Sequence, residues 1–270
     1  MIKIATNIIK GLFKQHVKER SRSPRIKWLR EKVLKHQDDK EIKSVKLGKI
    51  RIVYKRPYEL IHTYKEVFQN EIYRFETSKN TPLIIDCGSN IGISVLYFKT
   101  LYPNCNLIAF EPDKGNFELL EKNVRLNGLQ NVDLIKAAVW LENGEVIFAG
   151  NESEASHITK ETSGVNVKSI RLNDVLQQHN EVDFLKIDIE GAECQVIPDC
   201  EKNLDRVKNI FLEYHGKTSE TESFSRLLTI LYASGFSVYI KNAADNLLHP
   251  FVEKNTGTNY DVQLNLFCYR

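Results

Sequence analysis

The residues best suited to chemistry begin with the segment Asp86-Cys87-Gly88-Ser89-Asn90-Ile91-Gly92, in which a carboxylate precedes two glycines. The segment lies between a short apolar run and an amphipathic one, which predicts a turn from a strand into a helix. Glycines at such a turn let a ligand lie against backbone amides at the start of the helix. The spacing is not the G-x-G-x-x-G of a dinucleotide site. Asp86 would repel a pyrophosphate but suits the ammonium group of an amino-acid moiety, whereas an ordinary tight turn is the alternative.

A second acidic residue supports a ligand at this turn. Glu111 ends the next apolar run about 20 residues beyond the glycines, where a carboxylate can bridge the two hydroxyls of a ribose. A solvent-exposed acid at the end of a strand would explain Glu111 taken alone. Together the two signals favour a ligand that carries both adenosine and an amino-acid arm, and S-adenosylmethionine is such a ligand.

Further acids follow the fourth apolar run, in Lys186-Ile187-Asp188-Ile189-Glu190-Gly191-Ala192-Glu193, and His215 follows the fifth. Ligands of open α/β sheets bind at the carboxyl ends of the strands, so we expect these side chains close to the glycine turn. They could form a metal cluster, a site for a catalytic base, or the first-turn acids of a helix. The last possibility explains Glu193 well, but it explains Asp188 and Glu190 less well.

The elements that position these residues alternate along the chain. Short apolar runs are separated by amphipathic or helix-like segments, and this alternation is typical of a parallel sheet covered on both faces. Two more strands at the end of the chain, expected to return antiparallel, predict an α/β fold with a seven-stranded, mostly parallel sheet. The expected strands lie at 83–85, 107–110, 132–139, 183–187, 210–212, 235–240 and 262–269.

Four segments of the chain resemble the FkbM-type methyltransferase family, and they lie at 86–92, 110–112, 136–139 and 186–193. The likeness covers roughly residues 46–270, and its most specific part is D-I-E-G-A-E. It implies a Rossmann-like fold, S-adenosylmethionine as cofactor, and O-methylation of a hydroxyl, often of a sugar or polyketide. It also implies the positions that hold the cofactor. These are Asp86, Gly88, Ser89, Asn90, Gly92, Glu111 and Ala137.

A hydroxyl acceptor needs help to lose its proton, from a base or from a metal ion. We take Asp188 and His215 as candidate bases, with Glu190 next and His157 as a weaker candidate. A metal such as Mg²⁺ usually takes ligands from several loops. The sequence does not show such convergence, so we assign no metal ligand and expect no required metal ion.

Charge is divided unevenly along the 270 residues, although the net charge is only +3. Residues 1–56 carry 18 Lys and Arg against 5 Asp and Glu, and residues 57–270 carry 20 against 30. The five cysteines include no C-x-x-C pair, and no apolar stretch approaches the ~20 residues of a membrane span. We therefore expect a cytoplasmic protein, with a basic helical segment at 1–45, a hairpin and helix at 46–80, and the cofactor-binding domain at 81–270.

The basic segment leaves several partners open. A lid over the site or an arm in a homodimer is the first expectation, and contact of residues 1–35 with the inner membrane surface is the second. A nucleic-acid methyltransferase or nucleic-acid-binding protein is the alternative from another class. The chain has no N-P-P-Y or D-P-P-Y block after the fourth strand and no Pro-Cys pair, which counts against base methylation. We expect acceptor selectivity to depend on the polar segments 150–165 and 241–260.

Overall fold

The structure is a computed structural model and describes residues 25–149, 157–158, 164–247, 249–252 and 260–270. Its central sheet has seven strands, and every neighbouring pair is parallel except the two pairs that involve β13. Only β13 therefore runs against the others, and the predicted seven-stranded, mostly parallel sheet is confirmed. The order is β12 (Ser237–Ala244), β13 (Val262–Tyr269), β11 (Asn209–Gly216), β10 (Phe184–Ile187), β3 (Leu83–Cys87), β4 (Asn106–Phe110) and β5 (Val132–Ile135).

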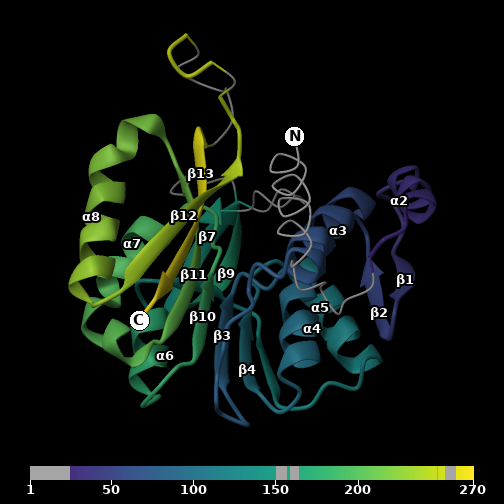
Figure 1. Cartoon of the computed structure of the whole chain (residues 1–270), viewed down its shortest axis with the longest axis horizontal. Helices are drawn as coiled ribbons and strands as arrows, with labels where there is room; N and C mark the ends of the chain where they lie inside the picture. The colour runs from purple at the N-terminus through teal and green to yellow at the C-terminus, as the bar shows by residue number, and fades with distance from the viewer. Residues whose placement is uncertain (1–24, 150–156, 159–163, 248, 253–259) are drawn as a thin grey trace, which may run out of the picture.

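Helices cover both faces of this sheet, as Figure 1 shows. The helices α4 (Ile93–Leu101) and α5 (Lys114–Leu126) lie on one face, and α6 (Leu172–Gln177), α7 (Glu193–Asp199) and α8 (Thr221–Ala233) lie on the other. Side chains alternate along each strand, so Ile84 packs into the core on the α4 face and Ile85 into the core on the α7 face. This alternation places Asp86 on the α4 face.

The predicted strand over 132–139 is wrong as a single strand. It divides at Ala137, whose N–H donates to the Ile135 carbonyl at 3.0 Å, and the chain leaves the sheet there. Because the apolar pattern continues through the turn, the sequence did not reveal the break. The second part, β6 (Ala138–Trp140), belongs to a four-stranded sheet with β9 (Val165–Arg171), β7 (Gly144–Ala149) and β8 (His157–Ile158). Much of the predicted selectivity segment 150–165 lies outside the described residues.

The chain before the sheet forms a helix, a hairpin and a second helix. These are α2 (Trp28–Lys35), β1 (Lys43–Leu47) with β2 (Ile50–Tyr54), and α3 (Pro57–Tyr64), which continues as the π-helical turn η1 (Lys65–Gln69). The helix predicted within 46–80 ends at Gln69, and Glu71 has a left-handed φ of 52°. Residues 1–24, which hold most of the predicted basic segment, lie outside the described residues.

A buried amide fixes the hairpin to the sheet domain. The Asn123 side chain in α5 donates to the carbonyls of Val53 and Ile91 at 2.9 and 2.8 Å, and it accepts from the Val53 N–H at 2.6 Å. Asn123 is fully buried, so these bonds are made without competition from water. The hairpin therefore lies firmly against α5, and α3 follows it toward the carboxyl edge of the sheet.

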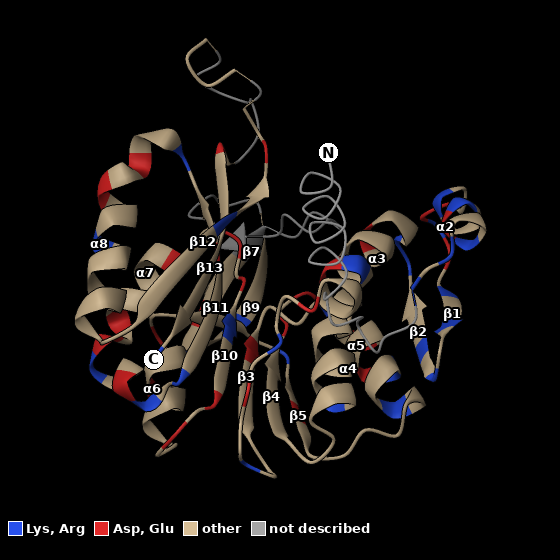
Figure 2. Ribbon diagram, viewed as in Figure 1, with Lys and Arg blue, Asp and Glu red and all other residues tan. Residues whose placement is uncertain are grey.

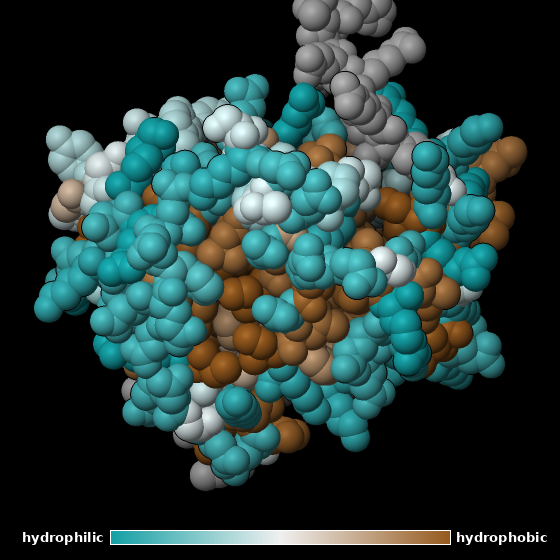
Figure 3. Space-filling model, turned by 90° about the horizontal axis from the view of Figure 1, so that it is seen from below, coloured by the Kyte–Doolittle hydropathy of each residue, from teal (hydrophilic) through white to brown (hydrophobic). Residues whose placement is uncertain are grey.

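The surface of the molecule is divided by polarity. Figure 2 shows Lys and Arg grouped on α2, β1 and β2, where residues 25–56 hold 12 basic against 4 acidic side chains. Figure 3 shows apolar residues at the centre of the face seen from below, at the end of the sheet away from the strands' carboxyl ends. In the described part of the chain, no helix is both long enough and apolar enough to cross a membrane.

Candidate active site

A cavity of about 470 Å³ lies where the carboxyl ends of β3, β4, β10 and β11 meet. Its volume falls within the ~300–1,000 Å³ of ordinary small-molecule sites. Side chains of α3 and η1, including Leu60, Thr63 and Glu66, form the opposite wall. Asp86 and Gly92, two of the predicted site residues, do not line the cavity, and the side chain of the weaker candidate base His157, in β8, lies outside what the structure describes. The structure brings the others together on its wall: Gly88, Ser89, Asn90, Glu111, Ala137, Asp188, Glu190 and His215.

The glycine loop at 88–92 is held in a left-handed conformation by its surroundings. Gly88, Asn90 and Gly92 have φ values of +87°, +48° and +88°. A Cβ on Gly88 would lie 1.8 Å from the backbone oxygen of Asp188, and one on Gly92 would lie 2.5 Å from Leu120. The glycines are therefore required by the close approach of β10 and α5, a reason that the spacing alone did not show.

Glu111 closes the other side of this loop. Its carboxylate accepts hydrogen bonds from the N–H groups of Asn90 at 2.8 Å and Asp113 at 2.9 Å. Burial raises the pKa of Glu111 to about 7, although both amide hydrogen bonds and Lys186 oppose the shift. The loop and the tip of β4 thus form one hydrogen-bonded unit on the cavity wall.

Asp86 lies behind the wall, where it meets a lysine that sequence analysis did not select. The Lys186 ammonium, 3% exposed, lies 3.4 Å from Asp86 and 3.2 Å from Asp188, and it donates to the Gly88 carbonyl at 2.8 Å. Burial opposes the charged form, but Asp188 and Asp86 raise the pKa of Lys186 well above its ordinary value. Asp86 also accepts a 2.5 Å hydrogen bond from Ser94, while its Oδ1 has no hydrogen bond within the described chain. Lys186 therefore connects the glycine loop to the acids that follow β10.

Those acids surround His215 at the end of β11. The His215 Nδ1 lies 3.4 Å from Glu193, and its Nε2 lies 3.6 Å from both Glu190 and Glu213. Burial alone would lower the pKa of His215. The contact with Glu193 and the negative charge of the nearby acids outweigh this effect and raise the pKa to about 10. The same burial, with mutual repulsion among the acids, raises the pKa of Glu190 to about 9 and that of Glu213 to about 8. This end of the cavity is therefore short of positive charge.

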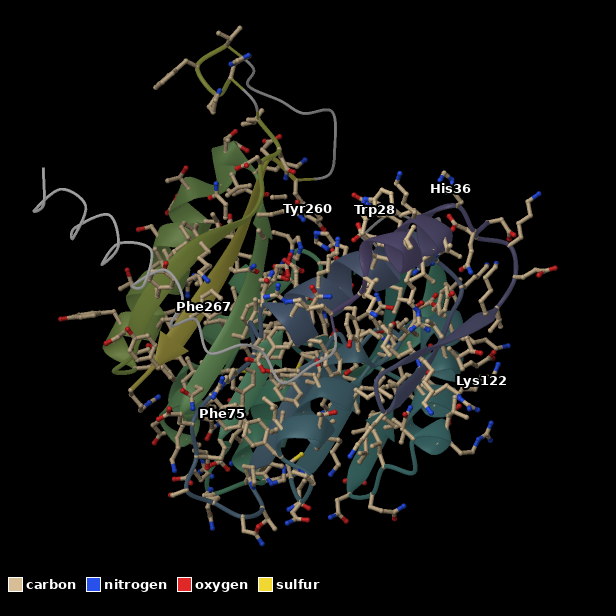
Figure 4. All side chains as sticks on the ribbon, turned by 45° about the vertical axis from the view of Figure 1, so that its right-hand side comes forward. Trp28, His36, Phe75, Lys122, Tyr260 and Phe267 are labelled. Carbon is tan, nitrogen blue, oxygen red and sulfur yellow. The ribbon has the colours of Figure 1, made fainter. Side chains whose placement is uncertain are left out.

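Three further residues complete this end: Glu193, which the sequence predicts near the glycine turn, and Glu213 and Tyr260, which the sequence did not single out. Glu193, expected to be a simple first-turn acid, is fully buried and accepts from the N–H groups of Ile189 and Gly191 at 3.2 and 3.1 Å. Glu213 could have been found, because it lies two residues before His215 on the same strand face. Tyr260 is the last residue of the predicted selectivity segment 241–260, but nothing in the sequence singled it out within that segment. Its hydroxyl donates to the Glu190 carbonyl at 2.6 Å, and Figure 4 shows it above the sheet on the segment leading into β13.

Comparison with known proteins gives consistent results. The Methyltransferase FkbM domain matches residues 86–238, more than half of the chain. "Methyltransferase 1" of Beauveria bassiana is 27% identical over 210 residues, which cover 68% of this chain and 82% of that protein. "2-O-methyltransferase NoeI" of Sinorhizobium fredii is 25% identical, over 50% of this chain and 64% of that protein. "Hexuronic acid methyltransferase AglP" of Haloferax volcanii is 27% identical, over 52% and 59%.

A mostly parallel sheet with a glycine loop after its first strand and an acid at the tip of the next is the arrangement of an S-adenosylmethionine-dependent methyltransferase. Within that class, the chain belongs to the FkbM methyltransferase family. The cavity fits the cofactor, since it presents bare glycine-loop backbone and the Glu111 carboxylate on one continuous wall.

Proposed function

We propose that the protein is an O-methyltransferase that acts on a hydroxyl of a sugar, a glycan or a related small molecule. The observation that carries this proposal is the position of Asp188, Glu190 and His215 in the same cavity as the glycine loop. The names of two relatives, a 2-O-methyltransferase and a hexuronic acid methyltransferase, support a sugar acceptor.

The residues divide between two roles. The loop residues Gly88, Ser89 and Asn90, with Glu111 and Ala137, would hold the cofactor, which supplies an electrophilic methyl group on a sulfonium when bound. Asp86 and Gly92 would act from behind the wall by fixing the loop. Restricting the acceptor to one orientation in a cavity shielded from water favours displacement at that methyl group.

The second role is to bind the acceptor, and we assign it to Asp188, Glu190 and His215. Asp188 is paired with Lys186, and His215 is held by Glu193. The Glu190 carboxylate accepts no hydrogen bond from a described residue, and its raised pKa makes the deprotonated form a stronger base. In that form Glu190 would receive the hydroxyl proton. Asp188 and His215 would then orient the hydroxyl.

A labelled-methyl transfer screen against cell-envelope glycans and simple glycosides tests the proposal. We expect transfer to a hydroxyl, and we expect Glu190→Gln to lower kcat about a hundredfold or more. Glu118→Gln, on the exposed surface of α5, is the matched control and should leave kcat unchanged. Transfer to RNA or DNA with none to glycans would contradict the proposal and support the nucleic-acid alternative, as would full activity in Glu190→Gln.

A further inference from the structure

Asp188, Glu213 and His215 each offer one ligand atom, and the three atoms lie within 4.8 Å of one another. They come from the ends of β10 and β11, two strands that lie side by side. We propose that these three side chains bind a divalent metal ion beside the acceptor. This inference rests on the proposed function, because the acceptor hydroxyl would be a further ligand. The sequence alone favours a reaction without a required metal ion, because it does not show that these ligands converge.

The orientation of His215 is an independent observation that points to a ligand. The side chain is 2% exposed, and Glu193 fixes the ring from its Nδ1 side. In the neutral imidazole, the form that a metal ion would bind, Nδ1 donates to Glu193 and the Nε2 lone pair faces the acids. Metal-binding histidines are commonly held in this way, with the other ring nitrogen donating to a carboxylate. No hydrogen bond joins Nε2 to a described residue, and its nearest partners are the carboxylates of Glu190 and Glu213, each 3.6 Å away.

The carboxylates around this nitrogen also lack partners. Neither Glu190 nor Glu213 accepts a hydrogen bond from any residue that the structure describes, and each has His215 as its only ion-pair neighbour. Glu66 adds a further carboxylate to the same cavity. Lys186 cannot compensate for these charges, since Asp86, Asp188 and the Gly88 carbonyl already surround it. A dipositive ion would supply the missing charge, whereas a neutral hydroxyl acceptor would not.

The donor set indicates which ions would suit. Two carboxylates and one imidazole favour a first-row ion such as Mn²⁺, whereas Mg²⁺ and Ca²⁺ prefer oxygen ligands alone. A hydroxyl bound to such an ion loses its proton more readily. The proton would pass to Glu190, a carboxylate next to the His215 Nε2 that is not among the proposed ligands. The oxygen would form its bond to the methyl carbon as the bond from that carbon to the sulfonium sulfur breaks, and the electron pair of the broken bond would stay on sulfur as a neutral thioether.

The test measures Mn²⁺ binding by the full chain after dialysis against a chelator, using the loss of the free-ion electron paramagnetic resonance signal. We expect one site, with affinity weakened about tenfold or more in Glu213→Gln and in His215→Gln. Glu66→Gln removes a carboxylate from the same cavity but not from the proposed ligands, so it should weaken the affinity far less than Glu213→Gln does. Thermal unfolding of each variant verifies that it is folded.

The outcomes separate this inference from the proposed function. Absence of Mn²⁺ binding at millimolar concentration, or equal affinity in folded Glu213→Gln and in the unaltered chain, would overturn the metal site. Glycan methylation that persists undiminished in excess chelator would do the same while leaving the proposed function intact. Site-specific Mn²⁺ binding without transfer to any hydroxyl would uphold the metal site and reject the proposed acceptor.

Discussion

At the scale of single residues, Lys186 is the cation shared by two carboxylates, Asp86 and Asp188. Replacing it in Lys186→Met would leave both acids near each other without a counter-charge. Breaking a buried pair in this way costs about 3–5 kcal/mol, so we expect a loss of that size in the free energy of unfolding measured with urea. Lys35→Met removes an exposed pair with Glu31 and should leave the free energy of unfolding nearly unchanged. Equal losses in the two variants would show that Lys186 is not needed to balance the acids.

Glu111 gives a pH-dependent prediction. Its pKa is raised to about 7 by burial, with Asp113 raising it further and Lys186 and the two backbone amides lowering it. Only the deprotonated carboxylate can accept from both hydroxyls of a ribose. Cofactor affinity should therefore rise as pH increases through about 7, by roughly tenfold between pH 6 and pH 8.

Calorimetric titration with S-adenosylmethionine at several pH values would measure this effect. The amino group of the ligand titrates equally with every variant, so the comparison with Glu111→Gln isolates the carboxylate. That variant should bind more weakly at pH 8 and show a flatter pH profile. Parallel profiles for the two proteins would argue against a contact between Glu111 and the ribose.

At the scale of elements, the turn from β3 into α4 depends on a close contact with the end of β10. In Gly88→Ala the new Cβ would lie 1.8 Å from the Asp188 backbone oxygen, so one of the two segments must move. Gly128 also has a positive φ, but a Cβ there meets nothing within 4 Å. We expect Gly128→Ala to cost roughly 1 kcal/mol from its backbone conformation alone. Gly88→Ala should cost clearly more and abolish cofactor binding, as urea unfolding and calorimetry would show; similar costs would refute the contact.

The sequence predicted these elements well where a local pattern determined them. Alternating apolar runs predicted the seven-stranded sheet, and Asp86 and Glu111 were placed at strand ends where they lie in the structure. The break at Ala137 was not predictable, since apolar residues continue across it. Lys186 was overlooked because a lysine inside a strand is informative only when its distant partners are known. Tyr260 contacts Glu190 across 70 positions of the chain, and a single sequence contains no signal for such a contact.

At the scale of the whole molecule, basic and acidic side chains are concentrated in different regions. The hairpin and α2 are rich in basic residues, while the cavity is lined by several carboxylates, among them Glu66, Asp188, Glu190 and Glu213. An acceptor that itself bears a carboxylate would meet this negative potential before it reached the site. The distribution of charge, rather than any one contact, therefore favours neutral acceptors over acidic ones.

We expect a neutral glycoside to be methylated with a higher kcat/KM than the matching uronic acid, by about tenfold, which corresponds to about 1.4 kcal/mol. Raising the salt concentration from 50 to 300 mM should reduce this difference in kcat/KM, because ions screen the repulsion between the uronic acid and the carboxylates of the cavity. Steady-state assays of the pair at both salt concentrations would measure it. Preference for the uronic acid at low salt would contradict the expected effect of the acidic cavity.

The second sheet is formed by a segment whose two ends lie next to each other at the central sheet. The chain leaves the central fold at β6, directly after Ala137 on the cavity wall, and re-enters α6 from β9. The two stems are paired, with Trp140 opposite Arg171. A segment whose ends are already adjacent can be lengthened, shortened or exchanged at little entropic cost to the rest of the protein. The segment between β6 and β9 could therefore change in evolution, and with it the acceptor that is preferred, while the glycine loop and Glu111 stay unchanged.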